Sequence, residues 1–314
     1  MRWPLIRFLP SHTNIDFVRL APFAAVLSGI AIIASCISFG VQGLNLGIDF
    51  AGGTQIEVVT QGPAPLGGLR NALNSRPDVT DSQVQGFGAA NSAMLRFKPK
   101  PGQDANEGVG KIERSLSAQF PGIQFRQVEV VGPKVSAELF LGGFKALGLA
   151  VLLMMAYIWF RFQLQFGLGA VIALAHDVLL TIGILSALRI EFSTSSIAAL
   201  LTVIGYSMNE KVITFDRLRE NLRKFKRTPL REVINLSENE RLSRTLITGA
   251  SALLALSGTL VMGGPALFPL VFTMAFGILV GTYSSVYVAL PLILLWGVRR
   301  GDEIEIITPQ GARP

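Results

Sequence analysis

The chain has 314 residues, of which 50% are hydrophobic and only 16% carry a charged side chain. A soluble globular domain has about 25% charged residues, so this composition, with a mean hydropathy of +0.48, indicates a membrane protein. The net charge of +7 does not indicate nucleic-acid binding, because it belongs to a hydrophobic chain. One cysteine cannot form an intrachain disulfide, and two histidines leave little for a histidine-based metal site. We therefore expect no metal and no cofactor.

Six stretches with few charged residues are predicted to cross the membrane as helices. A helix needs roughly 20 residues to span a hydrocarbon core about 30 Å thick. The stretch from Thr245 to Val298 has 54 uncharged residues, and the Gly263-Gly264-Pro265 sequence divides it into two helices. These two follow predicted spans at residues 21–41, 139–160, 166–188 and 192–215.

The distribution of basic residues predicts how these spans are oriented. Nine Lys or Arg residues lie between positions 217 and 244, whereas residues 42–139 have nine basic and nine acidic residues. Because cytoplasmic loops carry the excess of Lys and Arg, both termini are predicted to be cytoplasmic. The predicted organisation is a cytoplasmic segment 1–20, a first span 21–41, a periplasmic domain 42–138, spans two to six within 139–298 with a basic cytoplasmic loop near 217–243, and a cytoplasmic tail 299–314.

The exported segment is predicted to fold as a small α+β domain. Hydrophobic spacing predicts, in order, a strand at 54–59, a helix at 66–74, strands at 83–87 and 93–97, a helix at 105–120 and a strand at 123–131. This is the βαββαβ, ferredoxin-like order, which packs two helices on one face of an antiparallel sheet. The predicted fold class is therefore a bundle of six transmembrane helices with this α+β domain. The domain either contacts a substrate or is a passive cap, and its fold alone does not decide between them.

Ionisable residues inside predicted spans mark candidate ion or substrate pathways, because they are costly in hydrocarbon. Asp177 lies in the middle of the third span, where it either carries a proton or makes a packing hydrogen bond. Glu210 in the fourth span has Arg244, near the start of the fifth, as its predicted partner. Burial favours the neutral acid and a guanidinium favours the carboxylate, so Glu210 can change its protonation when the arginine moves. Alternatively, Glu210 and Arg244, and Lys211 beside them, extend toward cytoplasmic headgroups.

Other positions are candidates for packing and for coupling between the domain and the helices. The last span repeats small residues, and a tightly packed helix pair is favoured over ion coordination by its serines; the packing candidates are Gly277, Gly281, Ser284 and Ser285. Gly132 and Pro133, where the exported domain leads into the second span, form the candidate hinge. The chain has no Walker A, dinucleotide-binding or HExxH motif, so we expect neither ATP hydrolysis nor any other enzymatic activity.

Several motifs, taken in order, resemble the SecD/SecF family of protein-export membrane subunits, in the resistance-nodulation-division class of proton-driven transporters. They are GIDFAGGT at 47–54, VGP at 131–133, ALAHDV at 173–178, GYSMN at 205–209, FDRLREN at 215–221, LSRTL at 242–246 and GTYSS at 281–285. The resemblance implies a six-span subunit of the bacterial inner membrane that, with SecD, uses the proton-motive force to promote protein translocation. It also implies contact with the channel proteins SecY, SecE and SecG, with associated insertion factors and with unfolded exported polypeptides.

The resemblance also implies roles for individual residues. The proton-linked carboxylate of the family, usually Asp, follows a Tyr-Ser-x-Asn motif and falls here on Glu210, directly after Asn209. The paired arginine falls on Arg244, and Lys211 could compete as a partner. The candidate proton relay is therefore Glu210, Arg244, Asp177 and Asn209. A scaffold subunit that only stabilises the channel, and a subunit of a proton-driven small-molecule exporter, are the alternative functions.

Overall fold

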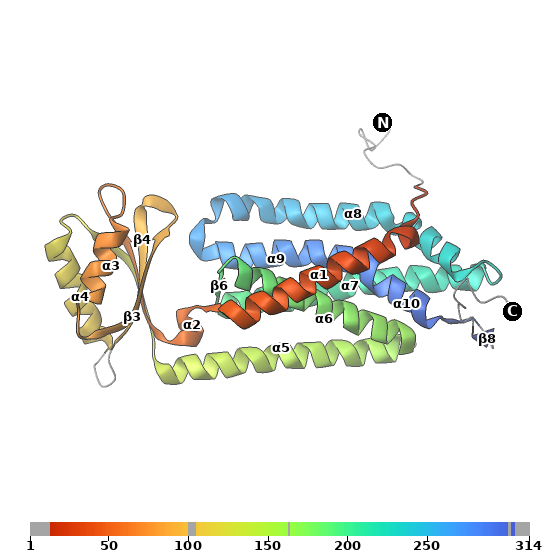
Figure 1. Cartoon of the computed structure of the whole chain (residues 1–314), viewed down its shortest axis with the longest axis horizontal. Coiled ribbons are helices and arrows are strands. Elements are labelled where there is room, and N and C mark those ends of the chain that lie inside the picture. The colour runs from red at the N-terminus through yellow and green to blue at the C-terminus, as the bar shows by residue number, and fades with distance from the viewer. Residues whose placement is uncertain (1–12, 100–104, 163, 301–302, 305–314) are drawn as a thin grey trace, which may run out of the picture.

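Long helices form a bundle, and a small α+β domain lies at one end of it (Figure 1). The computed structural model describes residues 13–99, 105–162, 164–300 and 303–304, so much of the predicted amino-terminal segment and carboxy-terminal tail lies outside the described residues. The bundle helices are α1 (Phe17–Gln42), α5 (Pro133–Arg161), α6 (Leu164–Ala187), α7 (Thr194–Lys224), α8 (Leu230–Met262) and α9 (Gly264–Ser284), which continues through a π-helical turn (Ser285–Ala289) into α10 (Leu290–Trp296).

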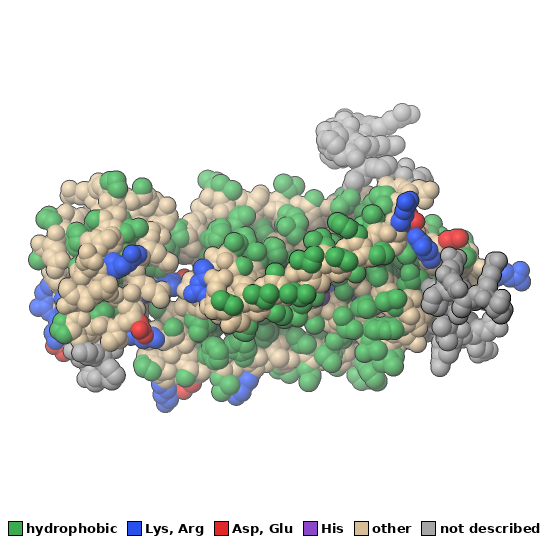
Figure 2. Space-filling model, in the orientation of Figure 1, with side chains coloured by type: hydrophobic (Ala, Val, Ile, Leu, Met, Phe, Trp, Pro, Cys, Tyr) green, Lys and Arg blue, Asp and Glu red, His purple; other side chains and the backbone are tan. Residues whose placement is uncertain are grey.

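Among the described residues, five helical stretches are long and apolar enough to cross a membrane: α1, α5, α6, α8 and the continuous stretch from α9 to α10. The chain is therefore a multi-pass membrane protein. Hydrophobic side chains cover most of the visible face of the bundle (Figure 2). The prediction of six spans counted α7 as well, but this helix is less apolar because Asn209, Glu210 and Lys211 lie near its middle.

Local sequence explains where several helices begin and end. The Asp16 side chain caps α1 by accepting a hydrogen bond from the backbone N–H of Arg19 at 3.0 Å. Pro133 occupies the first turn of α5, where its missing N–H costs nothing. The chain reverses between α8 and α9 at Gly264, whose φ of 72° is in the left-handed region that favours glycine. Helix α8 begins at Leu230 and not near the expected residue 245, so the fifth predicted span is the second half of a longer helix.

The small domain has the element order β-α-β-β-α-β. It consists of β2 (Gly53–Val59), α3 (Leu66–Asn74), β3 (Val79–Phe87), β4 (Ala89–Pro99), α4 (Ala105–Gln119) and β5 (Gln124–Val131). The strands form an antiparallel sheet in the order β3-β4-β2-β5. Ile56 and Val58 of β2 point into a core with Leu69, Ile112 and Leu116 of the two helices. The alternate residues of β2 belong to the opposite face of the sheet, which faces the bundle.

Two short segments connect the domain to the nearer ends of the bundle helices (Figure 1). β1 (Asn45–Leu46), which follows α1, pairs in parallel with β6 (Glu191–Phe192), which follows α6. The short helix α2 (Ile48–Ala51) then leads into the sheet, and its Phe50 packs against Phe192 and Ile197. The segments before β2 and before α7 therefore share one hydrophobic cluster. At the far end of the chain, β7 (Arg299–Arg300) pairs with β8 (Glu303–Ile304).

Candidate functional site: a buried cluster of charged residues

Two helices bring a carboxylate and an ammonium group together in the centre of the bundle. Asp177 of α6 and Lys211 of α7 both have 0% exposed surface, and Lys211 Nζ lies 2.7 Å from Asp177 Oδ2. The hydroxyls of Ser207 and Ser284 also donate to Asp177 Oδ2, at 2.5 and 2.8 Å. Buried charges are stable only when they are paired and hydrogen-bonded, and both conditions hold here.

The hydrogen bonds of Asp177 extend to α1 on the other side of α6. His176 Nδ1 lies 2.9 Å from Asp177 Oδ1, and His176 Nε2 lies 3.1 Å from the Ser28 hydroxyl. Ser28 in turn lies 2.9 Å from the hydroxyl of Tyr283, which donates to the carbonyl of Ala24. The imidazole of His176 thus connects Asp177 to the hydroxyl of Ser28 on α1.

A second set of charges lies next to the first, between α7 and α8. Arg241 makes two hydrogen bonds to Glu238, at 2.7 Å each, and its Nη1 lies 3.5 Å from Glu210 Oε2. Thr245 donates to the same Glu210 oxygen at 3.2 Å, and Arg241 Nη2 donates to the hydroxyl of Ser285 at 3.1 Å. Glu210 and Glu238 are each only 1% exposed. The guanidinium is therefore shared unequally between two buried carboxylates and is held mainly by Glu238.

The predicted pairing of Glu210 with Arg244 is wrong in this structure. Arg244 is exposed on the surface of α8 and makes no ion pair with any described residue, whereas Arg241, one turn earlier, faces Glu210. The reason is the length of α8, which places Arg241, Thr245 and Gly249 in one buried row at a spacing of four. That row of small and polar residues is the sequence signal by which Arg241 could have been found.

Two other candidates also lie differently from expectation. Lys211 does not extend toward the headgroups, because Asp177 of the neighbouring helix holds it inside the bundle. Asn209 is exposed and has no hydrogen bond from its side chain to the other described residues, so the structure does not bring it into the cluster.

The small residues of α9 face α7 and approach it closely. A Cβ atom added to Gly277 would overlap the side chain of Val203, and one added to Gly281 would lie 3.1 Å from Ser207 Cβ. Ser284 and Ser285 follow on α9 and the π-helical turn, where their hydroxyls bond to the charged cluster as described above. Glycine is thus placed where the backbones must be close, and serine where the charges need partners.

The cluster as a whole holds three carboxylic acids, two strongly basic side chains and the imidazole of His176. With the three acids ionised, Lys211 and Arg241 protonated and His176 neutral, its net charge is −1. A net charge in a low-dielectric bundle is unfavourable, so uptake of one proton would neutralise the site. The arrangement therefore suits a group that gains and loses a single proton.

The candidate hinge lies between the domain and α5. Gly132 is the N-cap residue of α5, with φ of −70° and ψ of 155°, and Pro133 is the first residue of the helix. The Ser136 hydroxyl donates to the Pro133 carbonyl at 3.0 Å and closes the first turn. The connection between the domain and α5 is thus a single extended residue, Gly132, followed directly by the helix. This geometry is compatible with a hinge.

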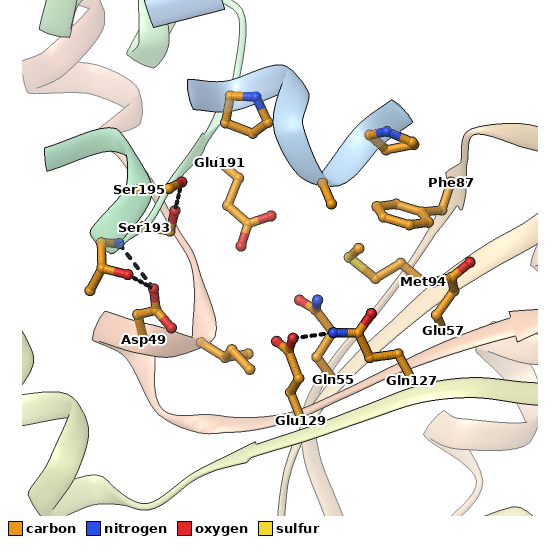
Figure 3. Close-up of a pocket in the computed structure, with 15 residues that line it drawn as sticks. Asp49, Gln55, Glu57, Phe87, Met94, Gln127, Glu129, Glu191, Ser193 and Ser195 are labelled. Atoms are coloured by element: carbon orange, nitrogen blue, oxygen red, sulfur yellow. Dashed lines mark hydrogen bonds between the residues drawn. The ribbon is translucent and has the colours of Figure 1, made fainter. Parts of the chain in front are cut away.

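A cleft of about 270 Å³ lies between the open face of the sheet and the first residues of α7 and α9 (Figure 3). Glu57, Gln127 and Glu129 line it from the sheet, and Glu191 and Asp49 from the bundle side. Figure 3 also shows Asp49 accepting hydrogen bonds from the backbone and hydroxyl of the first residue of α7, at 2.9 and 2.6 Å. Carboxylates therefore approach the cleft from both sides.

One ion pair crosses from the domain to the bundle beside this cleft. Arg96 of β4 binds the carboxylate of Glu191 in β6 and also donates to Gln55 Oε1 at 2.8 Å. Gly88, in the turn between β3 and β4, lies close to Pro265 at the start of α9. These two contacts connect the domain to the bundle at positions that are distant in the sequence.

A bundle of apolar helices with paired charges at its centre and a small α+β domain at one end defines a multi-pass membrane protein of the transport type. Comparison with protein-family models is consistent with this class. Residues 111–299 match the model described as protein export membrane protein SecD/SecF, C-terminal, and residues 37–64 match the SecD/SecF GG motif.

Individual relatives narrow the assignment. The chain is 44% identical over 306 residues to the protein translocase subunit SecF of Cereibacter sphaeroides, covering 94% of both chains. It is also 44% identical over 313 residues to the SecF subunit of Rhodobacter capsulatus, covering 95% of this chain and 93% of that one. The crystal structure of SecDF from Thermus thermophilus, a translocon-associated membrane protein, matches with a TM-score of 0.84 and 29% identity over 92% of this chain and 40% of SecDF.

The chain belongs to the SecD/SecF family of protein-export membrane proteins, and the two relatives that it matches over more than nine-tenths of their length are SecF subunits. It is thus a subunit of the Sec export pathway and not an enzyme in the classical sense. The family resemblance found in the sequence is confirmed.

Proposed function

We propose that this subunit couples proton movement through the buried cluster to displacement of the α+β domain, and so promotes translocation of polypeptides across the cytoplasmic membrane. The observation that carries the proposal is the imbalance of three buried acids against two buried, strongly basic side chains, which leaves a net charge of −1 while His176 is neutral. One proton is the natural unit by which such a cluster changes its charge. Moving one charge through 100 mV is worth about 2.3 kcal/mol, which is enough to bias a conformational equilibrium.

Within the cluster, Glu210 is the acid that would gain and lose the proton. Its contact with Arg241 is 3.5 Å, whereas Glu238 holds the same guanidinium through two bonds of 2.7 Å. Asp177 is held by an ammonium, two hydroxyls and an imidazole. Protonation of Glu210 therefore weakens fewer close contacts than protonation of either other acid. Arg241 can then turn entirely toward Glu238. Ionisation of Glu210 would draw the guanidinium back, which shifts α8 relative to α7.

The domain would respond through the helices that carry these charges. Helix α7 contains Glu210 near its middle, and its first residues line the cleft next to the domain. Glu191 lies only three residues before the start of this helix. A shift of α7 would therefore strain the ion pair between Glu191 and Arg96. Gly132 and Pro133 would act as the hinge about which the domain moves.

The proposed topology has six spans, with α7 as the one not identified by hydropathy. Its 31 residues correspond to about 46 Å of helix, and many of its residues are buried by the neighbouring helices. The basic residues between 217 and 244 favour a cytoplasmic position for the loop between α7 and α8, and hence for both termini. The α+β domain, residues 42–138, would then be periplasmic and the protein would lie in the inner membrane.

We also propose that a homologous SecD chain is the direct partner. The chain spans 40% of the matched SecDF protein, which leaves room for a second half of similar construction. The family resemblance adds the channel proteins SecY, SecE and SecG, associated insertion factors and unfolded exported chains as further partners. No cofactor is part of the proposal.

The test is to reconstitute the chain with SecD and the channel in vesicles and to measure export against an imposed proton gradient. Glu210→Gln should reduce export to the level seen without a gradient, and the exposed Glu220→Gln on the same helix should retain the gradient effect. Unchanged gradient-dependent export by Glu210→Gln, with normal complex assembly, would favour the scaffold function. Gradient-driven efflux of a small dye by the same vesicles would favour the exporter.

A further inference from the structure

An apolar groove of about 190 Å³ lies between α1, α5 and α6, away from the charged cluster. It is on the half of the bundle nearer the α+β domain, because its wall includes the end of α1, the end of α6 and the first half of α5. The lining residues are Ser35, Cys36, Phe39, Leu44, Phe144, Leu147, Leu179, Ile182, Gly183 and Phe192.

The groove opens to the surface of the bundle that faces lipid. Its rim residues Phe39, Phe144 and Leu179 are 50%, 43% and 44% exposed, whereas Phe192 at its base is 1% exposed. None of the most apolar 18-residue window of α5 is buried by the rest of the chain, so α5 does not close the groove against α1. In a membrane, the occupant of such a groove must be apolar and must come from the hydrocarbon.

An exposed arginine lies beside one end of the groove, and an exposed lysine follows one of its lining residues in the sequence. Arg189 follows α6 and donates through Nη1 to the carbonyls of Gln42 and Gly43, at 2.8 and 3.5 Å, beside the groove residue Leu44. Its Nε and Nη2 groups have no hydrogen-bond partner among the described residues, and its side chain is exposed. Lys145 of α5 is also exposed and lies directly after the groove residue Phe144.

We propose that this groove binds one acyl chain of a membrane phospholipid whose phosphate contacts Arg189 and Lys145. A volume of 190 Å³ corresponds to roughly six water-sized units, which suits part of one acyl chain but not a whole lipid. The apolar wall and the two cations match the two halves of a phospholipid, because an arginine fork binds phosphate well and a lysine adds charge. The bound chain would fill the space between α1 and α5 and so support the first span against the second.

The first test measures the binding of phosphatidylglycerol to the delipidated, purified full chain by native mass spectrometry. Cys36→Trp fills the groove, whereas Ile37→Trp adds the same indole on the same helix, at a position that is 59% exposed and does not line it. Excluding only two methylenes is enough to change Kd about tenfold, so Cys36→Trp should bind at least that much more weakly than Ile37→Trp. Equal binding by both variants would overturn the proposal.

The second test addresses the headgroup. The double variant Arg189→Gln, Lys145→Gln should bind phosphatidylglycerol more weakly and should bind diacylglycerol, which has no phosphate, as the unmodified chain does. If diacylglycerol binds to the unmodified chain as tightly as phosphatidylglycerol, the assignment of the phosphate to these cations is overturned. Saturation by inorganic phosphate with no effect of acyl length would overturn the assignment of the groove.

The third test needs no substitution. Cys36 is the only cysteine of the chain and lines the groove, so alkylation by a maleimide reports on this position alone. Added phosphatidylglycerol should slow the alkylation severalfold at constant detergent, and the same concentration of diacylglycerol should slow it less, because diacylglycerol has no phosphate. An unchanged alkylation rate would contradict occupation of the groove.

Discussion

Lys211 and Asp177 form an ion pair that is completely enclosed by the helix bundle. Their charged atoms are 2.7 Å apart, and neither residue has exposed surface. The two residues are 34 positions apart in the sequence and belong to adjacent helices, so the pair fixes the rotation of α7 against α6. Because Glu210 precedes Lys211 directly, this pair also sets the direction in which Glu210 points. The ion pair and Glu210, the acid that we propose carries the proton, thus share one turn of α7.

Removal of one partner from this pair should be strongly destabilising. Lys211→Met leaves Asp177 with a buried and uncompensated charge, and we expect the free energy of unfolding to fall by about 3–5 kcal/mol. Thermal unfolding of the purified chain in detergent measures this loss. Lys224→Met is the matched control, because this lysine is exposed on the same helix and its ion pair is worth less than about 1 kcal/mol.

The double variant Lys211→Met, Asp177→Asn separates loss of the charge pair from loss of packing. It removes both charges, so it should recover a large part of the stability lost in Lys211→Met. A double variant as unstable as the sum of the two single variants would show that the two side chains are not coupled as the structure has them.

Arg241 and Arg244 of α8 give a second prediction, because the structure and the family pattern favour different residues. Arg241→Gln should destabilise the isolated chain and abolish gradient-dependent export, since Glu210 and Glu238 then lose their shared partner. Arg244→Gln should leave the melting temperature of the isolated chain unchanged, because this side chain is exposed. Comparison of both variants for melting and for export is the measurement. Normal melting of Arg241→Gln together with loss of stability in Arg244→Gln would contradict the observed pairing.

The sequence predicts the elements of this protein better than it predicts the partners within the cluster. Alternating residues located the strands of the small domain, and long uncharged stretches located most of the membrane helices, because both signals are local. The partner of Glu210 depends on which face of α8 meets α7, and both Arg241 and Arg244 fit the local pattern. The sequence around Lys211 allows its side chain to extend toward the lipid headgroups. Its burial is explained by Asp177, which belongs to a different helix.

The contact between α7 and α9 gives a third prediction. Gly277→Ala places a methyl group against Val203 with no free space, so α9 must shift, and we expect a loss of about 1–3 kcal/mol. Gly258→Ala on α8 has no atom within 4 Å of the added carbon and should be neutral or slightly stabilising. Melting temperatures of the two variants in the same detergent provide the comparison. If the two alanines have the same effect, the close approach at Gly277 is not a constraint on the fold.

The ion pair between Arg96 and Glu191 gives a fourth prediction, which concerns the position of the α+β domain. Arg96→Gln removes the charge that joins β4 to β6, so the domain should adopt a wider range of positions relative to the bundle. Spin labels at Ser117 of α4 and Ser257 of α8, in a Cys36→Ser background, would report this as a broader distance distribution.

Arg126→Gln is the control for this experiment. Arg126 is exposed on β5, and its contact with Glu57 is within the domain at 3.9 Å, so its loss should leave the distance distribution unchanged. The charge reversal Arg96→Glu, Glu191→Arg should restore a narrow distribution, because it keeps opposite charges at the two positions. A broad distribution in the reversed pair, with the domain still folded, would show that the attraction between these two side chains does not hold the domain. The domain would then depend on the β1–β6 pairing and on the contact of Gly88 with Pro265.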